Sequence, residues 1–377
     1  MKIVVAPDSF KGSCTAKKAA ESIKEGILRV CKTADVVCVP MADGGEGTVQ
    51  SLVDATGGRL INARVMGPLM EEVEACYGIL GDGKTAVIEM AAASGIMLVP
   101  RESRNPMKTT TYGTGELIRH AMDSGCRNII IGIGGSATND GGAGMAQALG
   151  IRLLDVYGND VGFGGGSLTR LHTIDMSHMD ERIKQCTFTA ACDVDNPMCG
   201  PKGATYVYGP QKGASEEMLE NLDAALDRYA ELIKAATGTA VKDIPGAGAA
   251  GGLGGGLLAF LGAVLRKGID MVIETVKLEE LITGADLVIT GEGRIDYQTQ
   301  FGKTPYGVAR LAKKYNVPVI ALAGYIGDGA NILYDKGIDS MFSIIDRPMT
   351  VEEAMADADT LLQSASERIM RLYNIFN

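Results

Sequence analysis

The chain has 377 residues, 46% of them hydrophobic and 22% charged, which predicts a globular protein with more than one core. A net charge of −10, without a basic stripe or interleaved aromatic residues, excludes nucleic acid as a partner. The eight cysteines show neither C-x-x-C nor zinc-site spacing, so we expect reduced thiols in a cytoplasmic protein. The uncharged stretch 245–265 is rich in Gly and Ala, and only its last nine residues are strongly apolar. These nine residues are too few to span a membrane, and the whole stretch predicts a glycine loop that leads into a buried helix.

Both ends of the chain show strands that alternate with helices. The predicted strands are short apolar runs rich in β-branched residues, at 1–7, 35–40, 285–291, 317–324 and 337–345. The predicted helices cover 15–30, 304–315 and about 351–373, the first with Thr15 as its N-cap. Together these segments predict a flavodoxin-like, doubly wound parallel sheet of five strands, in an α/β fold.

The middle of the chain has a different pattern. Residues 59–90 alternate apolar and polar positions and contain the turn signal "GDGK", which predicts long antiparallel strands. Mixed α/β segments follow. We therefore expect two domains, a discontinuous flavodoxin-like domain of 1–58 and 282–377, and an inserted mixed α/β domain of 59–281.

Three polar, glycine-containing loops follow strands of the predicted parallel sheet. They are "PDSFKGS" (7–13), "MADGGEGT" (41–48) and "TGEGRID" (290–296). Ligands bind at the carboxyl edge of such sheets, near the switch point, so we expect these loops to face one crevice. Their residue types suit phosphoryl transfer. The reaction needs carboxylates to hold a divalent ion, cations to neutralise the phosphoryl group, and backbone N–H groups at glycine turns to bind phosphate oxygens.

The inserted domain contributes two further candidate loops, "GIGGSATNDGGAG" (132–144) and "CDVDNP" (192–197). The first fits the permissive dinucleotide pattern G-x-G-x-x-A, with Asp155 at the distance of a ribose contact, but the helix-hostile "TNDGG" follows it. An NAD(P)-dependent hydroxy-acid oxidoreductase and a non-catalytic binding protein therefore remain as alternatives.

Other motifs have simpler interpretations. "GKTP" (302–305) lacks the first glycine of a P-loop, since position 297 is Tyr, and we interpret Thr304 as a helix N-cap with Pro305 at N1. Glycines 246–256 predict either close helix packing or an anion-binding backbone nest. His172 and His178 are expected on the surface.

Taken together, "APDSFKGS", "DGGEGT", "GIGGSATNDGGAG", "CDVDNP", "GAGAAGGLG", "TGEGRID" and "GKTPYGVA" resemble, in this order, the bacterial glycerate kinase family that lacks a Walker A motif. The resemblance runs from residue 2 to about 350. It implies ATP-dependent phosphorylation of D-glycerate, mostly to 2-phospho-D-glycerate, with a glycerate 3-kinase as the alternative. It also implies that the inserted domain is restriction-endonuclease-like. Monomeric and homo-oligomeric states both stay open.

The resemblance assigns roles to the candidate residues, with ATP and Mg²⁺ as cofactors. Asp193 is the expected general base, preferred over Asp195 because the family varies there, and Lys11 is expected to neutralise the transferred phosphoryl group. The glycerate side, expected in the cleft between the domains, comprises Gly134, Gly135, Ser136, Asn139, Asp140 and Arg294. The nucleotide side comprises Asp8, Ser9, Gly44, Gly45, Gly291 and Gly293. The expected Mg²⁺ ligands are Asp43, Glu46 and Glu292.

Overall fold

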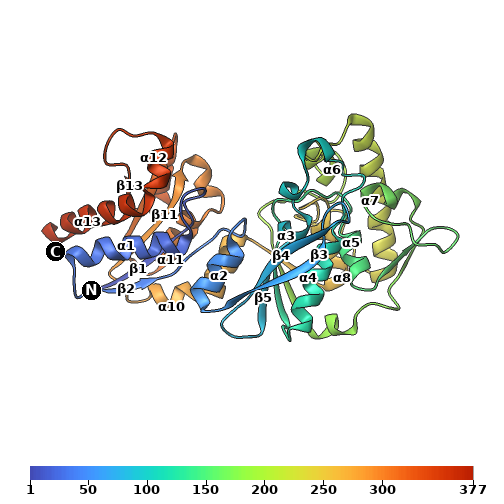
Figure 1. Ribbon diagram of the computed structural model, residues 1–377, viewed down its shortest axis with the longest axis horizontal. Coiled ribbons are helices and arrows are strands. Elements are labelled where there is room, and N and C mark those ends of the chain that lie inside the picture. The colour runs from blue at the N-terminus through green and yellow to red at the C-terminus, as the bar shows by residue number, and fades with distance from the viewer. Residues whose placement is uncertain (377) are drawn as a thin grey trace. The chain divides into compact units, whose positions relative to one another are not determined.

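The computed structural model describes residues 1–376 and divides into two compact units (Figure 1). Unit 1 consists of Met1–Gly57 and of the described chain from Gly268 onward, and unit 2 is Gly58–Lys267. Within residues 1–376, no helix is both long enough and apolar enough to cross a membrane.

Unit 1 is built on a five-stranded sheet in which every pair of neighbours is parallel. Its strands are β1 (Lys2–Pro7), β2 (Asp35–Cys38), β11 (Leu287–Ile295), β12 (Val319–Ile326) and β13 (Ser340–Ser343). Their order, β13-β12-β11-β1-β2, is that of flavodoxin-like doubly wound sheets. The five parallel strands predicted from the sequence are thus confirmed, and the switch point lies between β1 and β11.

Seven α-helices of the described chain surround this sheet. They are α1 (Ala16–Val30), α2 (Thr48–Thr56), α9 (Gly268–Thr275), α10 (Leu278–Ile282), α11 (Thr304–Lys314), α12 (Val351–Ala356) and α13 (Ala358–Phe376). Thr15 caps α1 as predicted, its hydroxyl accepting from the Lys18 N–H. The single C-terminal helix predicted was wrong: a capping box formed by Thr350 and Glu353 starts α12, which ends before Asp357. The chain then begins a second helix.

Unit 2 holds a six-stranded mixed sheet of order β10-β9-β6-β5-β4-β3. Its strands are β3 (Arg59–Met66), β4 (Glu72–Ile79), β5 (Thr85–Glu89), β6 (Asn128–Gly132), β9 (Thr187–Ala191) and β10 (Val264–Arg266). The predicted antiparallel strands are present as β3-β4-β5, whereas β5, β6, β9 and β10 pair in parallel. A separate hairpin pairs β7 (Arg152–Leu154) with β8 (Thr173–Asp175).

The helices of unit 2 pack closely around a glycine-rich centre. They are α3 (Ala91–Ser94), α4 (Tyr112–Asp123), α5 (Ala143–Ala148), α6 (Ala204–Tyr208), α7 (Glu216–Thr237) and α8 (Leu253–Leu261). Helix α8 is buried and follows the glycine loop, as predicted. A Cβ at Gly251 would lie 2.0 Å from the Thr138 carbonyl oxygen, and one at Gly256 would lie 2.6 Å from that of Gly141. These contacts favour the close-packing interpretation of glycines 246–256.

The second boundary between the units lies at Lys267 and Gly268, earlier than the residue 282 expected from the sequence. Helix α9 packs on α11 of unit 1, where a Cβ at Gly307 would lie 2.2 Å from Cγ1 of Ile269. Gly268 itself lies against the Asp43 backbone. The apolar residues of 268–281 therefore complete the core of unit 1.

Candidate functional site

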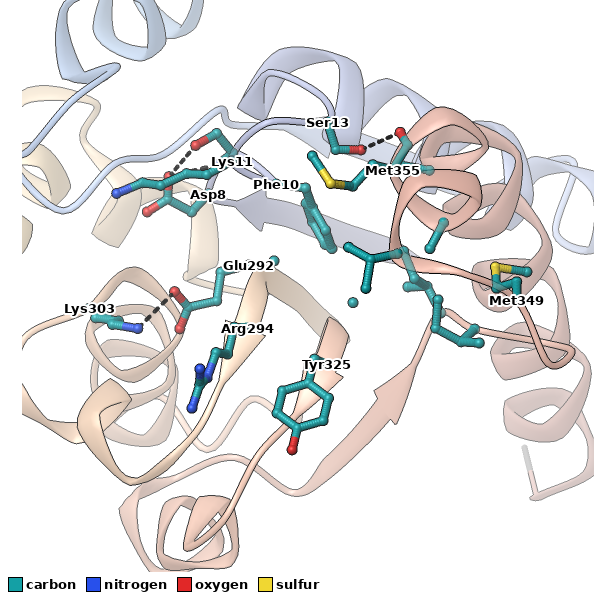
Figure 2. A pocket seen from close by; sticks show the side chains of 18 of the residues that line it. Asp8, Phe10, Lys11, Ser13, Glu292, Arg294, Lys303, Tyr325, Met349 and Met355 are labelled. Carbon is teal, nitrogen blue, oxygen red and sulfur yellow. Dashed lines mark hydrogen bonds and ion pairs between the residues drawn. The ribbon is translucent and has the colours of Figure 1, made fainter.

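A pocket of about 550 Å³ opens in unit 1 at the end of β1, beside the part of β11 that extends beyond it (Figure 2). Parallel strands point their carboxyl ends to one edge of the sheet, so the loop after β1 faces the last residues of β11 there. The prediction that 290–296 is a loop was wrong, because β11 continues to Ile295 through its pairing with β12. The pocket thus lies at the switch point of the sheet. Its lining includes seven residues predicted from the sequence, Asp8, Ser9, Lys11, Asp43, Glu292, Gly293 and Arg294.

The lining of the pocket divides into an apolar and a charged part, and Figure 2 shows Phe10, Met349 and Met355 apart from Glu292 and Lys303. The apolar part consists of Phe10, Tyr325, Ile344, Ile345, Met349, Val351, Ala354, Met355 and Ala358. The charged part consists of Asp8, Lys11, Asp43, Glu292, Arg294 and Lys303. A ligand with a flat apolar group at one end and anionic groups at the other fits this division.

Asp8 is the most buried carboxylate of the charged part, 6% exposed. Its Oδ2 accepts from the Thr304 hydroxyl at 2.6 Å, and its Oδ1 accepts from the Ser9 N–H at 2.6 Å. Burial, and then the nearby charge of Asp43, raise the pKa of Asp8 to about 6. A bound cation would reverse this effect, since it favours the ionised carboxylate.

Glu292 lies across the pocket from Asp8. Its Oε1 accepts from the Thr299 hydroxyl at 2.9 Å, and its Oε2 lies 3.5 Å from Nζ of Lys303. Burial raises the pKa of Glu292 to about 7, although the Lys303 ammonium lowers it. Asp8 and Asp43 add a smaller upward effect, so the three carboxylates feel one another's charge.

Arg294 is held by Asp296, just after its own strand, and by a residue of β12. Its Nε lies 2.8 Å from Oδ2 of Asp296, and its guanidinium carbon lies 5.5 Å from the centroid of the Tyr325 ring. The side chain is therefore oriented along the pocket wall by an ion pair and a cation–π contact.

Four residues predicted for the nucleotide or metal side are not among the lining residues. Gly44 and Gly45 belong to a turn in which the Gly45 N–H donates to Oδ1 of Asp43 at 3.0 Å. Glu46 is exposed in the same turn. Gly291 lies within the sheet, where a Cβ would come 2.3 Å from the Leu322 carbonyl oxygen. These positions shape the loops around the pocket.

In unit 2, the predicted substrate loop follows β6. Gly134 and Gly135 are exposed, whereas Ser136, Asn139 and Asp140 are buried. Gly132 of β6 is the parallel partner of Ala191 of β9, so this loop and the segment carrying Asp193 leave the sheet at the same edge. Asp193 is exposed, and its carbonyl oxygen accepts from Nζ of Lys267 at 3.5 Å.

The Asp140 carboxylate holds the substrate loop together. Its Oδ2 accepts from the Thr111 N–H at 2.8 Å, the Thr111 hydroxyl at 2.9 Å and the Gly144 N–H at 3.2 Å. Its Oδ1 accepts from the Gly142 N–H at 3.2 Å. The expectation that Asp140 binds the substrate is therefore corrected, because both of its carboxylate oxygens are already bonded. They join Thr111, at the start of α4, to Gly142 and Gly144, at the start of α5.

A buried polar cluster lies under the same loop. Lys212, 2% exposed, donates from Nζ to the Thr138 carbonyl oxygen at 2.6 Å. Burial lowers the pKa of Lys212 to about 7, although the Asp140 charge raises it. Nδ2 of Asn139 donates to the Thr205 hydroxyl at 2.9 Å. The amide nitrogen of this predicted substrate-binding residue therefore already has a partner within unit 2.

The sequence analysis did not predict that Lys303 lines the pocket, that Thr304 bonds Asp8, or that residues from 344 to 358 form much of its apolar part. The motif "GKTP" contains Lys303 and Thr304, and the sequence analysis interpreted it only as the start of a helix. Thr304 is the first residue of α11 and not its N-cap, which is Lys303. The Thr304 hydroxyl instead donates to Asp8, so the motif brings a lysine and a carboxylate partner to the pocket. No sequence motif marks the apolar part of the pocket, since its residues come together only in the folded chain.

The dinucleotide pattern and the histidines were the remaining sequence features. The G-x-G-x-x-A match precedes a buried segment, and α5 starts only at Ala143. Asp155 begins a local turn directly after β7, accepting from the Tyr157 N–H at 2.8 Å. This is not the strand-to-helix turn that binds a dinucleotide. His172 and His178 are exposed, as predicted. Among residues 1–376, no group of three or more His, Cys, Asp or Glu could by itself hold a metal ion.

Comparison with known proteins gives one consistent family. The family model described as the Glycerate kinase family matches residues 3–374. Glycerate kinase of Bacillus subtilis (strain 168) is 56% identical over 369 residues, which cover 98% of this chain and 97% of the relative. Glycerate 2-kinase of Escherichia coli (strain K12) is 55% identical over the same shares. A crystal structure from Salmonella typhimurium LT2, described as a candidate glycerate kinase 2, superposes with a TM-score of 0.93 at 51% identity, covering 100% of this chain and 98% of that one.

Proposed function

The chain belongs to the glycerate kinase family, and from this premise we propose that it transfers the γ-phosphoryl group of ATP to D-glycerate, giving 2-phospho-D-glycerate. The observation that carries the proposal is the pocket of unit 1, whose lining divides into an apolar and a charged part. The name of the Escherichia coli relative supports the 2-phosphate as product; a glycerate 3-kinase is the alternative.

We place ATP in the pocket of unit 1. The adenine would lie against the apolar part, around Phe10, Met349 and Met355, because a planar ring gains most from apolar contact. The triphosphate would lie at the charged part, with Lys11 and the backbone around Ser9 and Gly293 beside it. Lysine is a common phosphate binder, acting as a point charge.

The carboxylates of the charged part fit a Mg²⁺ ion that arrives with the nucleotide. Mg²⁺ is usually held by one or two carboxylates together with substrate phosphates, so a complete protein cage is not required. Asp43 and Glu292 line the pocket and would supply these oxygens, whereas Glu46 would act only from a distance. Once bound, the ion neutralises charge on the phosphate oxygens.

We assign glycerate to unit 2, to the loop at 133–142 and to Asp193 at the same sheet edge. The exposed backbone of Gly134 and Gly135 would donate to the glycerate carboxylate, with Ser136 and Asn139 as neighbouring polar groups and Arg294 as a cation. The glycerate hydroxyl oxygen would attack the γ-phosphorus while its proton passes to Asp193. The bond from that phosphorus to the β–γ bridging oxygen would break, and ADP would leave.

The two units would then be the two domains of the enzyme, unit 1 for the nucleotide and unit 2 for the acceptor. The restriction-endonuclease-like character of unit 2 is part of this proposal. We also propose a cytoplasmic enzyme, since all eight cysteines are free thiols. Light scattering on a sizing column would decide between a monomer and a homo-oligomer.

An ATP-consumption assay over a panel of small hydroxy acids tests the reaction, with D-glycerate expected as the best acceptor. ³¹P NMR of the product then distinguishes the 2-phosphate from the 3-phosphate. No ATP turnover with any hydroxy acid would overturn the proposal, and a 3-phosphate would replace the stated product with the alternative. Reduction of NAD(P) with a hydroxy acid would instead identify an oxidoreductase.

A further inference from the structure

Lys303 brings an ammonium group to the charged part of the pocket from the N-terminus of an eleven-residue helix. It is the N-cap residue of α11, and its side chain is 31% exposed. The Thr304 hydroxyl fixes this first turn by donating to the buried Asp8 carboxylate at 2.6 Å. The start of the helix is therefore held at the end of β1, which places the Lys303 backbone beside the pocket.

The ion pair with Glu292 points the Lys303 ammonium into the pocket (Figure 2). Nζ lies 3.5 Å from Oε2 of Glu292, while Oε1 of the same carboxylate accepts from Thr299. An ammonium has three donors, so it can contact this carboxylate and an anionic ligand at the same time. The helix N-terminus beside it adds a partial positive charge.

The other basic side chains of the lining are placed differently. Arg294 is paired with Asp296 and stacked on Tyr325, and its side chain is 65% exposed. Lys11 stands beside Asp8, on the β1 side of the pocket. A polyphosphate at the charged part would thus have Lys11, beside Asp8, on one side and Lys303, beside Glu292, on the other.

We propose that Lys303 is a phosphate-binding residue of the kinase, contacting the β- or γ-phosphate oxygens of ATP, with Glu292 as the residue that positions it. The inference rests on the proposed function, which places ATP in this pocket. Lys303 forms and breaks no covalent bond in the transfer; its charge offsets the charge that the departing ADP gains. It thereby shares the role of neutralising phosphate charge, which the sequence analysis gave to Lys11.

The test is nucleotide binding to the full-length protein by calorimetry, without turnover, using ATP, ADP and adenosine as probes. Lys303→Met should weaken ATP binding about 10- to 100-fold, the size of one hydrogen bond between charged groups, and leave adenosine within twofold of wild type. An equal loss for ADP indicates a contact to the β-phosphate, and unchanged ADP binding indicates a contact to the γ-phosphate. Lys303→Arg should recover part of the lost affinity. Lys314→Met, an exposed change at the other end of α11, is the matched control and should bind all three probes like wild type.

Each outcome decides the proposal. Equal losses for ATP and adenosine would show that Lys303 only supports the pocket, and unchanged ATP binding would show that it contacts no phosphate; either result overturns the inference. If the wild-type protein binds ATP but phosphorylates no glycerate, the proposed function fails while this test still stands. If wild type binds no adenine nucleotide, the nucleotide site itself is wrong.

Discussion

Asp140 offers the sharpest test of how the substrate loop is built. Its carboxylate accepts backbone N–H groups from Thr111, Gly142 and Gly144 in a fully buried setting. Asp140→Ala leaves these three donors without their acceptor, at about 1–3 kcal/mol each, so we expect a loss of roughly 5 kcal/mol. Asp140→Asn keeps one acceptor oxygen and removes the burial penalty that raises the Asp140 pKa, so its loss should be about 2 kcal/mol.

Thermal unfolding followed by circular dichroism measures this difference, with calorimetry to separate the two units. For a unit of this size, 1 kcal/mol shifts Tm by about 2–4 °C, which predicts a fall of about 10–20 °C for Asp140→Ala and about 4–8 °C for Asp140→Asn. Asp155→Ala is the matched control, since Asp155 also accepts backbone N–H groups but is only half-buried, in a surface turn, and it should change stability by less than about 1 kcal/mol. If Asp140→Ala has the Tm of wild type and a raised KM for glycerate, the structural role is refuted, and Asp140 binds the substrate instead.

Four further predictions concern the proposed chemistry and the buried groups. Asp193→Asn should lower kcat at least ~100-fold with little change in the KM for glycerate, whereas an unchanged kcat would remove Asp193 as the base. Lys11→Ala should also lower turnover strongly, and near-normal activity would make Lys11 a turn residue only. Gly144→Ala should destabilise by about 1–3 kcal/mol, because its Cβ would lie 2.0 Å from Oγ1 of Thr110, while Gly134→Ala, with nothing within 4 Å, should leave Tm unchanged. Lys212 has a pKa of about 7 when folded against 10.5 as its ordinary value, so between these pH values the unfolded chain binds the extra proton and stability rises with pH. Urea unfolding from pH 7 to 9 should show this slope, about 1.4 kcal/mol per pH unit, in wild type and not in Lys212→Met; equal slopes would contradict the assignment.

The sequence predicted the parts of the fold that local patterns encode. Apolar β-branched runs identified all five strands of unit 1, and Thr15 identified the start of α1, because strand burial and N-capping depend on neighbouring residues. It also predicted that segments 7–13 and 290–296 meet at one edge of the sheet, although 290–295 belong to β11 itself and not to a loop. The break at Asp357 was missed because the periodic pattern of the C-terminal segment continues across it.

By itself, then, the sequence determined the family, the parallel sheet and most of the charged part of the pocket, since these depend on motifs and on strand order. Only the tertiary structure decided what each polar group does. Asp140 and Asp8 look alike in the sequence, yet one is saturated by buried backbone donors and the other faces a pocket beside two more carboxylates. Lys303 likewise became a pocket residue because α11 starts against Asp8, a contact between positions 296 residues apart. Burial and hydrogen-bond partners arise from such long-range contacts, and no local pattern records them.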